Sequence, residues 1–395
     1  MNFSAFKSLP GNVWILAASQ SLALSMVPMM ILVSGLLAAK VAEDESLVTL
    51  PVALMVVGTA SATVPVAFVM KRLGRKRGGY VGFGFGLLAC GLGFLAAREV
   101  SFALLLGSSY CMGVASAFGQ QIRFAALESV PDPANYGPAL SAFMTGGLVA
   151  AYLGPEVGAR GRDWLESPYG FAGSFALLGG VLLMAIAVFS FYKEPVRRLE
   201  RTEVADRPLA GIVKSPAFLI AAGTAALSYA VMSFIMTATP ITMHELCGFS
   251  LDDTKRVIQW HIVAMYLPSL FAGWLMKRFG PGKLMLAGSL AYGIVLIVAL
   301  QGEAFAHFWG ALVLLGVGWN FLFASGTALL PRAYRGNERY KAQAANDFAV
   351  FGCQAVVALS AGWFLFRFGW SVLLLSCLPL VVVAGIVSVV QIRRR

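Results

Sequence analysis

The chain has 395 residues, of which 58% are hydrophobic and only 12% are charged. Because soluble domains carry about 25% charged residues and about 45–50% apolar ones, this composition excludes a soluble protein. The formal net charge of +11 does not indicate a nucleic-acid partner, because the cations stand at the ends of apolar runs, where they face lipid headgroups. The five cysteines and three histidines are too dispersed for a disulfide framework or a metal site. We therefore expect a protein that resides in the lipid bilayer.

Twelve runs free of Asp, Glu, Lys and Arg follow one another along the chain. The shortest has 19 residues, and a helix needs roughly 20 to cross the hydrocarbon core. Backbone groups in lipid must be hydrogen-bonded within the protein, so runs rich in Leu, Ala, Gly and Phe are predicted to be helices. The sequence predicts an all-α membrane protein with twelve transmembrane helices, in the runs 11–39, 46–70, 78–97, 100–122, 133–155, 167–192, 215–243, 257–276, 284–302, 304–331, 348–366 and 368–392.

A basic hairpin between the second and third runs recurs half a chain later. Its first copy is Val69-Met70-Lys71-Arg72-Leu73-Gly74-Arg75-Lys76-Arg77, and Leu275-Met276-Lys277-Arg278-Phe279-Gly280 follows 206 positions on. The longest polar segment, 193–214, stands between the sixth and seventh runs. We expect two pseudo-symmetric six-helix bundles, 1–192 and 215–395, joined by a cytoplasmic linker at 193–214.

The distribution of cations predicts the orientation. With both termini inside, 23 of the 30 Lys and Arg residues fall on the inner side and seven on the outer side. Short cytoplasmic loops carry such an excess of cations. We expect a multi-pass protein of the bacterial cytoplasmic (inner) membrane with both termini in the cytoplasm.

Two six-helix halves with a basic hairpin after the second helix of each resemble the major facilitator superfamily over essentially the whole chain. That family's hairpin motif runs Gly-x-x-x-Asp-Arg-x-Gly-Arg-Lys, and here Ala67 is followed by Lys71-Arg72-Leu73-Gly74-Arg75-Lys76. Lys71 and Lys277 stand where the family has aspartate. The resemblance implies a transporter whose halves rock around a central site.

Further segments resemble family motifs in part. Gly154-Pro155-Glu156-Val157-Gly158 is similar to a Gly-Pro signature of antiporters, although Ala150 replaces an expected glycine. In the fourth helix, Ser109 stands where the family often has an arginine linked to proton coupling. Gly316–Phe321, Gln343–Phe348 and Gln259–His261 resemble one bacterial subgroup, some of whose members are similar to riboflavin importers.

Embedded polar side chains are the candidate substrate contacts, because ionisable groups in lipid are costly and usually face a cavity or a partner. Arg123 could hold a carboxylate, phosphate or carbonyl of the substrate, or it could extend to the headgroups as a snorkelling side chain. A mostly apolar site with a few polar groups suits an organic solute. The substrate-binding candidates are Gln20, Gln120, Gln121, Arg123, Tyr152, Tyr229, Gln259, Trp260, His261, Trp319 and Asn320.

Few embedded groups could carry a proton. The candidates for proton coupling are Asp347, Glu156 and His261, the last because histidine titrates near neutrality. Two of them have a simpler interpretation: His261 as a hydrogen-bonded structural side chain, and Glu156 as an interfacial carboxylate near Arg160.

The hairpins lead to a hypothesis about gating. Because Lys71 replaces the family's aspartate, Asp347 could face Lys71 or Arg72 when the cytoplasmic side is closed, beside Arg75. By pseudo-symmetry, Lys277 or Arg278 could face Glu128 or Asp132.

The sequence thus predicts a secondary active transporter of a small organic solute, coupled to protons and monomeric in the bilayer. A facilitated uniporter of a metabolite or vitamin such as riboflavin is the alternative. A non-transporting membrane receptor or an intramembrane enzyme is a third class. No Gly-x-x-x-x-Gly-Lys-[Ser/Thr], His-Glu-x-x-His or Gly-x-Ser-x-Gly motif occurs, so we expect neither an enzyme nor a cofactor.

Overall fold

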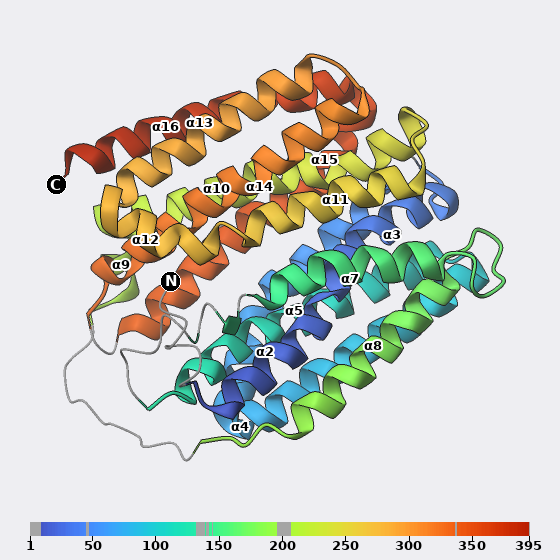
Figure 1. Ribbon diagram of the computed structural model, residues 1–395, viewed down its shortest axis with the longest axis horizontal. Helices are drawn as coiled ribbons and strands as arrows, with labels where there is room; N and C mark the ends of the chain where they lie inside the picture. Colours follow the sequence, from blue (N-terminus) through green and yellow to red (C-terminus); the bar gives the residue numbers. More distant parts are fainter. Residues whose placement is uncertain are drawn as a thin grey trace.

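The computed structural model describes residues 9–44, 47–131, 139, 142–143, 145–195, 207–335 and 338–394. A few side chains inside helices, including those of Lys71 and Lys277, also lie outside this description. Every regular element in these ranges is a helix, which confirms the all-α prediction. The helices run side by side in two groups (Figure 1).

The first group consists of α2 (Gly11–Leu24), α3 (Met26–Val41), α4 (Leu50–Glu99), α5 (Phe102–Glu128), α7 (Gly146–Gly161) and α8 (Ala172–Ser190). After the short α9 (Leu209–Val213), the second group comprises α10 (Pro216–Ile241), the π-helical η3 (Thr242–Leu246), α11 (Leu251–Tyr266), α12 (Ser269–Phe279), α13 (Pro281–Leu300), α14 (Phe305–Leu329), the 3-10 turn η4 (Leu330–Ala333), α15 (Arg339–Ser376) and α16 (Leu378–Arg393).

Within the described ranges, nine helical stretches are long and apolar enough to cross a membrane. One of them, Lys341–Arg393, contains two predicted runs, 348–366 and 368–392, and its helix is interrupted at Gly369 (φ 81°), two residues after the Arg367 that separates these runs. The fifth predicted run lies partly outside the described residues, and the eighth is divided into α11 and α12 beside Pro268. The architecture is therefore consistent with the twelve predicted spans.

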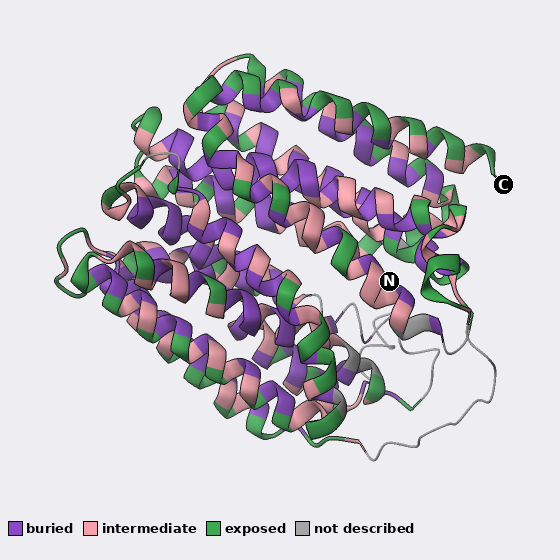
Figure 2. Ribbon diagram, turned by 180° about the vertical axis from the view of Figure 1, so that it is seen from behind, coloured by how far each residue is buried: buried purple, intermediate pink, exposed green. Residues whose placement is uncertain are grey.

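The surface of the outermost helices is apolar. On α16, Leu378, Val382 and Ile386 are about half exposed, while Val381 and Ala384 face the neighbouring helices. Figure 2 shows such exposed positions along the outside of the bundle. A helix with apolar residues on its outer side as well as its inner side is suited to lipid and not to water.

The two hairpins share one backbone conformation. Gly74 (φ 82°, ψ 171°) divides α4 into two helices, and Gly280 (φ 83°, ψ 155°) separates α12 from α13. Positive φ favours glycine, which has no Cβ. The structure thus repeats the same turn at the 206-residue spacing of the sequence. We call the end of the bundle that holds Gly74, Gly280 and Arg394 the hairpin end, and the end that holds Lys40, Asp163 and Asp252 the far end.

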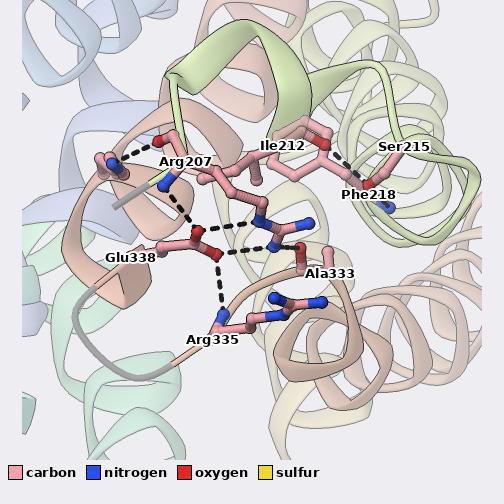
Figure 3. A network of polar contacts seen from close by, with 8 residues as sticks. Arg207, Ile212, Ser215, Phe218, Ala333, Arg335 and Glu338 are labelled. Carbon is pink, nitrogen blue, oxygen red and sulfur yellow. Dashed lines mark hydrogen bonds and ion pairs between the residues drawn. The ribbon is translucent and has the colours of Figure 1, made fainter. Parts of the chain in front are cut away.

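Only part of the predicted linker lies within the described residues, because 196–206 do not. Its last part packs on the second group, where Ile212 is fully buried. The Glu338 carboxylate accepts hydrogen bonds from Arg207 Nε (2.8 Å) and Nη2 (2.6 Å) and from the Arg335 backbone N–H (2.9 Å), as Figure 3 shows. Residues 207–213 therefore belong structurally to the second group. The division at 193–214 stays a prediction.

Candidate functional site

A cavity lies between the two helix groups. Its volume is about 140 Å³, and because a cavity needs about 10–15 Å³ for one water, it could take roughly ten waters or an organic molecule. Helices α2, α3, α4, α5 and α7 line it from the first group, and α10, α11 and α15 from the second. The lining residues are Leu24, Val27, Pro28, Ile31, Val52, Met55, Val56, Thr59, Ser116, Gln120, Ala150, Tyr229, Met232, Ser233, Met236, Thr237, His261, Ile262, Met265, Tyr266, Phe351 and Gln354.

Aromatic side chains form one wall of this cavity. The Tyr229 ring makes edge contacts with the rings of Phe351 (centroids 5.7 Å apart), Trp319 (5.3 Å) and Phe323 (5.2 Å). Trp319 stacks on Phe323 behind it, at 5.0 Å, and Tyr266 contacts Trp319 at 6.3 Å. Such clusters favour offset and edge-to-face packing. The wall is suited to the face of a flat ring system.

Polar groups interrupt the apolar lining at a few points. Gln354 donates to Ser233 Oγ at 3.3 Å across α15 and α10, and Thr59 Oγ1 is bonded to carbonyls of its own helix and of α5. His261 is fully buried, with Nδ1 2.7 Å from the Leu312 carbonyl. A mostly apolar pocket with a few directed polar groups is typical of an organic-ligand site.

Two ion pairs join the helix groups on either side of the cavity. On the hairpin side, Arg123 Nη2 of α5 lies 3.6 Å from Asp347 Oδ2 of α15. On the far side, Lys255 Nζ of α11 lies 3.0 Å from Glu156 Oε1 of α7. Gln120 and Ile262 line the cavity about one to two turns from these pairs. The cavity is thus bounded along the bundle by two charged contacts between the groups.

The Glu156–Lys255 ion pair, which we call the far-end contact, has supporting partners. Glu156 also accepts from Arg160 Nε at 2.8 Å, and Gln259 Nε2 donates to the Tyr152 carbonyl at 3.3 Å. A second bridge, between Lys40 and Glu245 at 3.0 Å, connects α3 with η3. Several contacts therefore hold the groups together at this end.

The first hairpin is tied to its own group. Arg75 donates to Glu128 Oε1 (2.8 Å) and to Gln121 Oε1 (3.1 Å). The Glu194 carboxylate accepts from the backbone N–H groups of Arg75 and Lys76, beside the turn at Gly74. The hairpin and the start of the linker are therefore held together within the first group.

Of the predicted substrate contacts, Gln120, Tyr229 and His261 line the cavity. Trp319 lies directly behind Tyr229, and Asn320 donates to the Met265 carbonyl at 2.7 Å. The structure places the others away from the lining. Gln20 lies against Gly119, Gln121 binds Arg75, Arg123 pairs with Asp347, Gln259 belongs to the far-end contact, and Tyr152 and Trp260 are exposed.

The gate residues have other partners in this structure. Asp347 pairs with Arg123, Glu128 pairs with Arg75, and the Arg278 guanidinium lies over the Trp274 ring at 5.5 Å. Asp132 and the side chains of Lys71 and Lys277 lie outside the described residues. The pairing of Asp347 with Lys71 or Arg72 stays a prediction.

Sequence reasoning missed most of the lining of α10 and α15. Met232, Ser233, Met236 and Thr237 follow Tyr229 at intervals of three and four residues, which places them on one helix face. That spacing from Tyr229 was the available signal. Nothing in the sequence marked Phe351 or Gln354, although Asp347 precedes Phe351 by one turn.

The fold and sequence have counterparts among known proteins. A family model described as the Major Facilitator Superfamily matches residues 13–265 and 222–395. The riboflavin transporter RfnT of Brucella anthropi is 37% identical over 388 residues, which cover 97% of this chain and 96% of that protein. The uncharacterised transporter YddS of Bacillus subtilis is 31% identical over 80% of this chain and 76% of its own. The crystal structure of the transporter FucP in its outward conformation superposes with a TM-score of 0.64 at 15% identity, over 95% of this chain and 97% of that one.

Proposed function

Because the chain belongs to the major facilitator superfamily and is thus a membrane transporter and not an enzyme, we propose that it carries riboflavin across the bacterial cytoplasmic membrane. The observation that carries the proposal is the 37% identity to a riboflavin transporter over nearly the whole length of both chains. Riboflavin has a flat isoalloxazine ring system and a polyhydroxylated ribityl chain. Aromatic rings and several polar side chains in one cavity between the groups suit both parts.

Transport proceeds by alternating access, in which the two groups rock about the cavity. The Arg123–Asp347 pair closes the hairpin end, and the Glu156–Lys255 pair closes the far end. Each pair has to separate when its own side opens. The hairpin end is cytoplasmic in this proposal, as the positive-inside distribution of cations predicts. The protein acts as a monomer, because each chain encloses a complete cavity.

Transport is driven by protons in this proposal, with Asp347 as the carrier. Its carboxylate lies next to the cavity and pairs with a cation at 3.6 Å, so protonation would weaken a contact that closes one side. Glu156 is the second candidate, because it makes the equivalent contact at the other end. Facilitated uniport of riboflavin is the alternative mechanism, and it needs no titrating group.

Uptake by the purified protein tests both parts of the proposal, the substrate and the coupling to protons. In proteoliposomes, we expect counterflow of labelled riboflavin, and accumulation above equilibrium only when a pH gradient is imposed. Asp347→Asn should keep counterflow but lose accumulation, while Asp163→Asn, on the exposed surface, should keep both. Absence of riboflavin counterflow would refute the substrate, whereas counterflow without accumulation under any gradient would favour the uniporter.

A further inference from the structure

His261 uses one of its two ring nitrogens within the protein. Nδ1 lies 2.7 Å from the Leu312 carbonyl, and a carbonyl can only accept, so Nδ1 carries the proton. In the neutral ring, Nε2 then holds a lone pair. Nε2 is buried and has no hydrogen-bond partner among the described residues. His261 therefore presents a buried acceptor of defined orientation.

An unpaired buried acceptor calls for an explanation, because nearly all buried polar atoms in native proteins are hydrogen-bonded. No carboxylate contacts His261 in the part of the chain that the structure describes, and its surroundings on α11 and α14 are largely apolar. A neutral ring is favoured there, because burial of an unpaired charge is costly. His261 lines the cavity, but none of its surface is accessible to water there. A solute in the cavity can therefore provide the missing donor when the side chains that cover Nε2 move apart.

We propose that Nε2 of His261 accepts a hydrogen bond from the imide N–H of the transported flavin's ring system. This inference rests on the proposed function and assigns a residue to one atom of the substrate. The rings of Tyr229 and Tyr266 line the same cavity as His261, and both contact the Trp319 ring. In this proposal they pack against the flat ring beside the imidazole, so the donor comes from the ring and not from the ribityl chain.

Orientation of the imidazole strengthens this role. The Leu312 carbonyl holds one edge of the ring, so little side-chain freedom is lost when the flavin binds. A site built to pair with a donor rejects an analogue that lacks it, because the buried acceptor is then left unpaired. His261 thus acts as a specificity-determining residue for solutes with an imide or similar ring N–H.

The test combines three flavins with three proteins, with dissociation constants measured by flavin fluorescence on protein in nanodiscs. The ligands are riboflavin, 3-methylriboflavin, which lacks the imide hydrogen, and lumiflavin, which keeps it but lacks the ribityl chain. The proteins are wild type, His261→Asn and His261→Gln. Asparagine can still donate to the Leu312 carbonyl from the position of Nδ1, whereas glutamine can place an oxygen near the position of Nε2.

Loss of one hydrogen bond should weaken binding about tenfold. We expect this loss for wild type when 3-methylriboflavin replaces riboflavin, and for His261→Asn with riboflavin and lumiflavin alike. His261→Asn should bind 3-methylriboflavin as wild type does, and His261→Gln should recover part of the affinity for riboflavin. The comparison of riboflavin with 3-methylriboflavin uses the wild-type protein alone, so it does not depend on whether a variant folds.

Other outcomes overturn the inference in distinguishable ways. Equal wild-type affinity for riboflavin and 3-methylriboflavin would refute the imide contact while leaving riboflavin transport intact. If His261→Asn weakens the binding of riboflavin but not of lumiflavin, the donor lies on the ribityl chain and the ring assignment is refuted. Failure of wild type to bind any of the three flavins would refute the proposed function, and this inference with it.

Discussion

Arg123 and Asp347 join the two helix groups with 3.6 Å between Nη2 and Oδ2, about one helical turn from the cavity-lining residues Gln120 and Phe351. Both side chains are partly exposed, at 31% and 25%, and such a pair contributes about 1 kcal/mol. That energy is small for folding but shifts a balanced conformational equilibrium several-fold.

Removal of this pair should open the hairpin end. We expect Asp347→Asn to raise the labelling rate of a cysteine at Ser233, in the cavity, several-fold in inside-out vesicles. The exchanged variant Arg123→Asp with Asp347→Arg should restore slow labelling in part. If the exchanged variant labels as fast as the faster single variant, the pair does not close this end.

Removal of the far-end pair should have the opposite effect. Lys255→Met leaves Glu156 without its cationic partner from α11, so we expect faster labelling of the same cysteine in right-side-out vesicles. Asp163→Asn is the matched control, because Asp163 is 87% exposed and, among the described residues, forms an ion pair with its neighbour Arg162 alone. Equal labelling of the Lys255 variant and the control would show that another contact closes the far end.

Close packing of α4 on α5 should make Gly113 intolerant of alanine. A Cβ at Gly113 would meet the Met55 carbonyl and lie 2.8 Å from the Thr59 nitrogen, both backbone atoms that cannot move aside singly. Overpacking of this kind costs about 1–3 kcal/mol, so the melting temperature in detergent should fall. Gly91→Ala, with nothing within 4 Å of the new Cβ, should leave it unchanged. An unchanged melting temperature for Gly113→Ala would contradict the close packing of α4 on α5.

Acid should weaken the attachment of residues 207–213 to the second group. The hydrogen bonds from Arg207 hold the pKa of Glu338 well below its ordinary value of about 4.3. A carboxyl with a depressed pKa in the folded state stabilises that state above its ordinary pKa, and this stabilisation is lost as pH falls toward the folded-state pKa. We expect the melting temperature to fall below about pH 4, and Glu338→Gln to make that fall smaller. An identical pH profile for wild type and Glu338→Gln would contradict this role.

Cysteine labelling should establish the orientation in the membrane. In a background with Cys247→Ser, cysteines at Asp163 and Asp252 should react with an impermeant maleimide in whole cells, because both sites are exposed at the far end. Cysteines at Lys214 and Arg332, which are exposed at the hairpin end, should react only after permeabilisation. The reverse pattern would invert the proposed topology.

The helices and the repeated turn could be predicted because their causes are local. Lipid requires long uncharged helical runs, and a turn with positive φ favours glycine at Gly74 and at Gly280 alike. The lining of the cavity could not be predicted as well. In a membrane helix the side that faces lipid is as apolar as the side that faces other helices, so periodicity does not reveal the rotation of the helix. Trp260 and His261 are neighbours in sequence, yet Trp260 is 52% exposed and His261 fully buried.

The partners of the charged side chains could not be predicted from the sequence either. The sequence singled out Asp347 and Arg123 separately, but their contact depends on how α5 and α15 are placed across the interface. The same holds for Glu194, whose carboxylate accepts from two backbone N–H groups more than a hundred residues earlier. Such partners follow from tertiary arrangement and not from local pattern.

The break between α11 and α12 allows α11 to tilt about the residues next to Pro268. Pro268 lacks a backbone N–H and interrupts the helix, while Asn320 binds the Met265 carbonyl and Ser269 Oγ and so fixes the pivot. At 1.5 Å per residue, His261 lies roughly 10 Å from this pivot and Lys255 roughly 20 Å. Any tilt of α11 about the pivot therefore moves Lys255 about twice as far as it moves His261. A sub-ångström adjustment around a bound ring would be magnified at the Glu156–Lys255 ion pair.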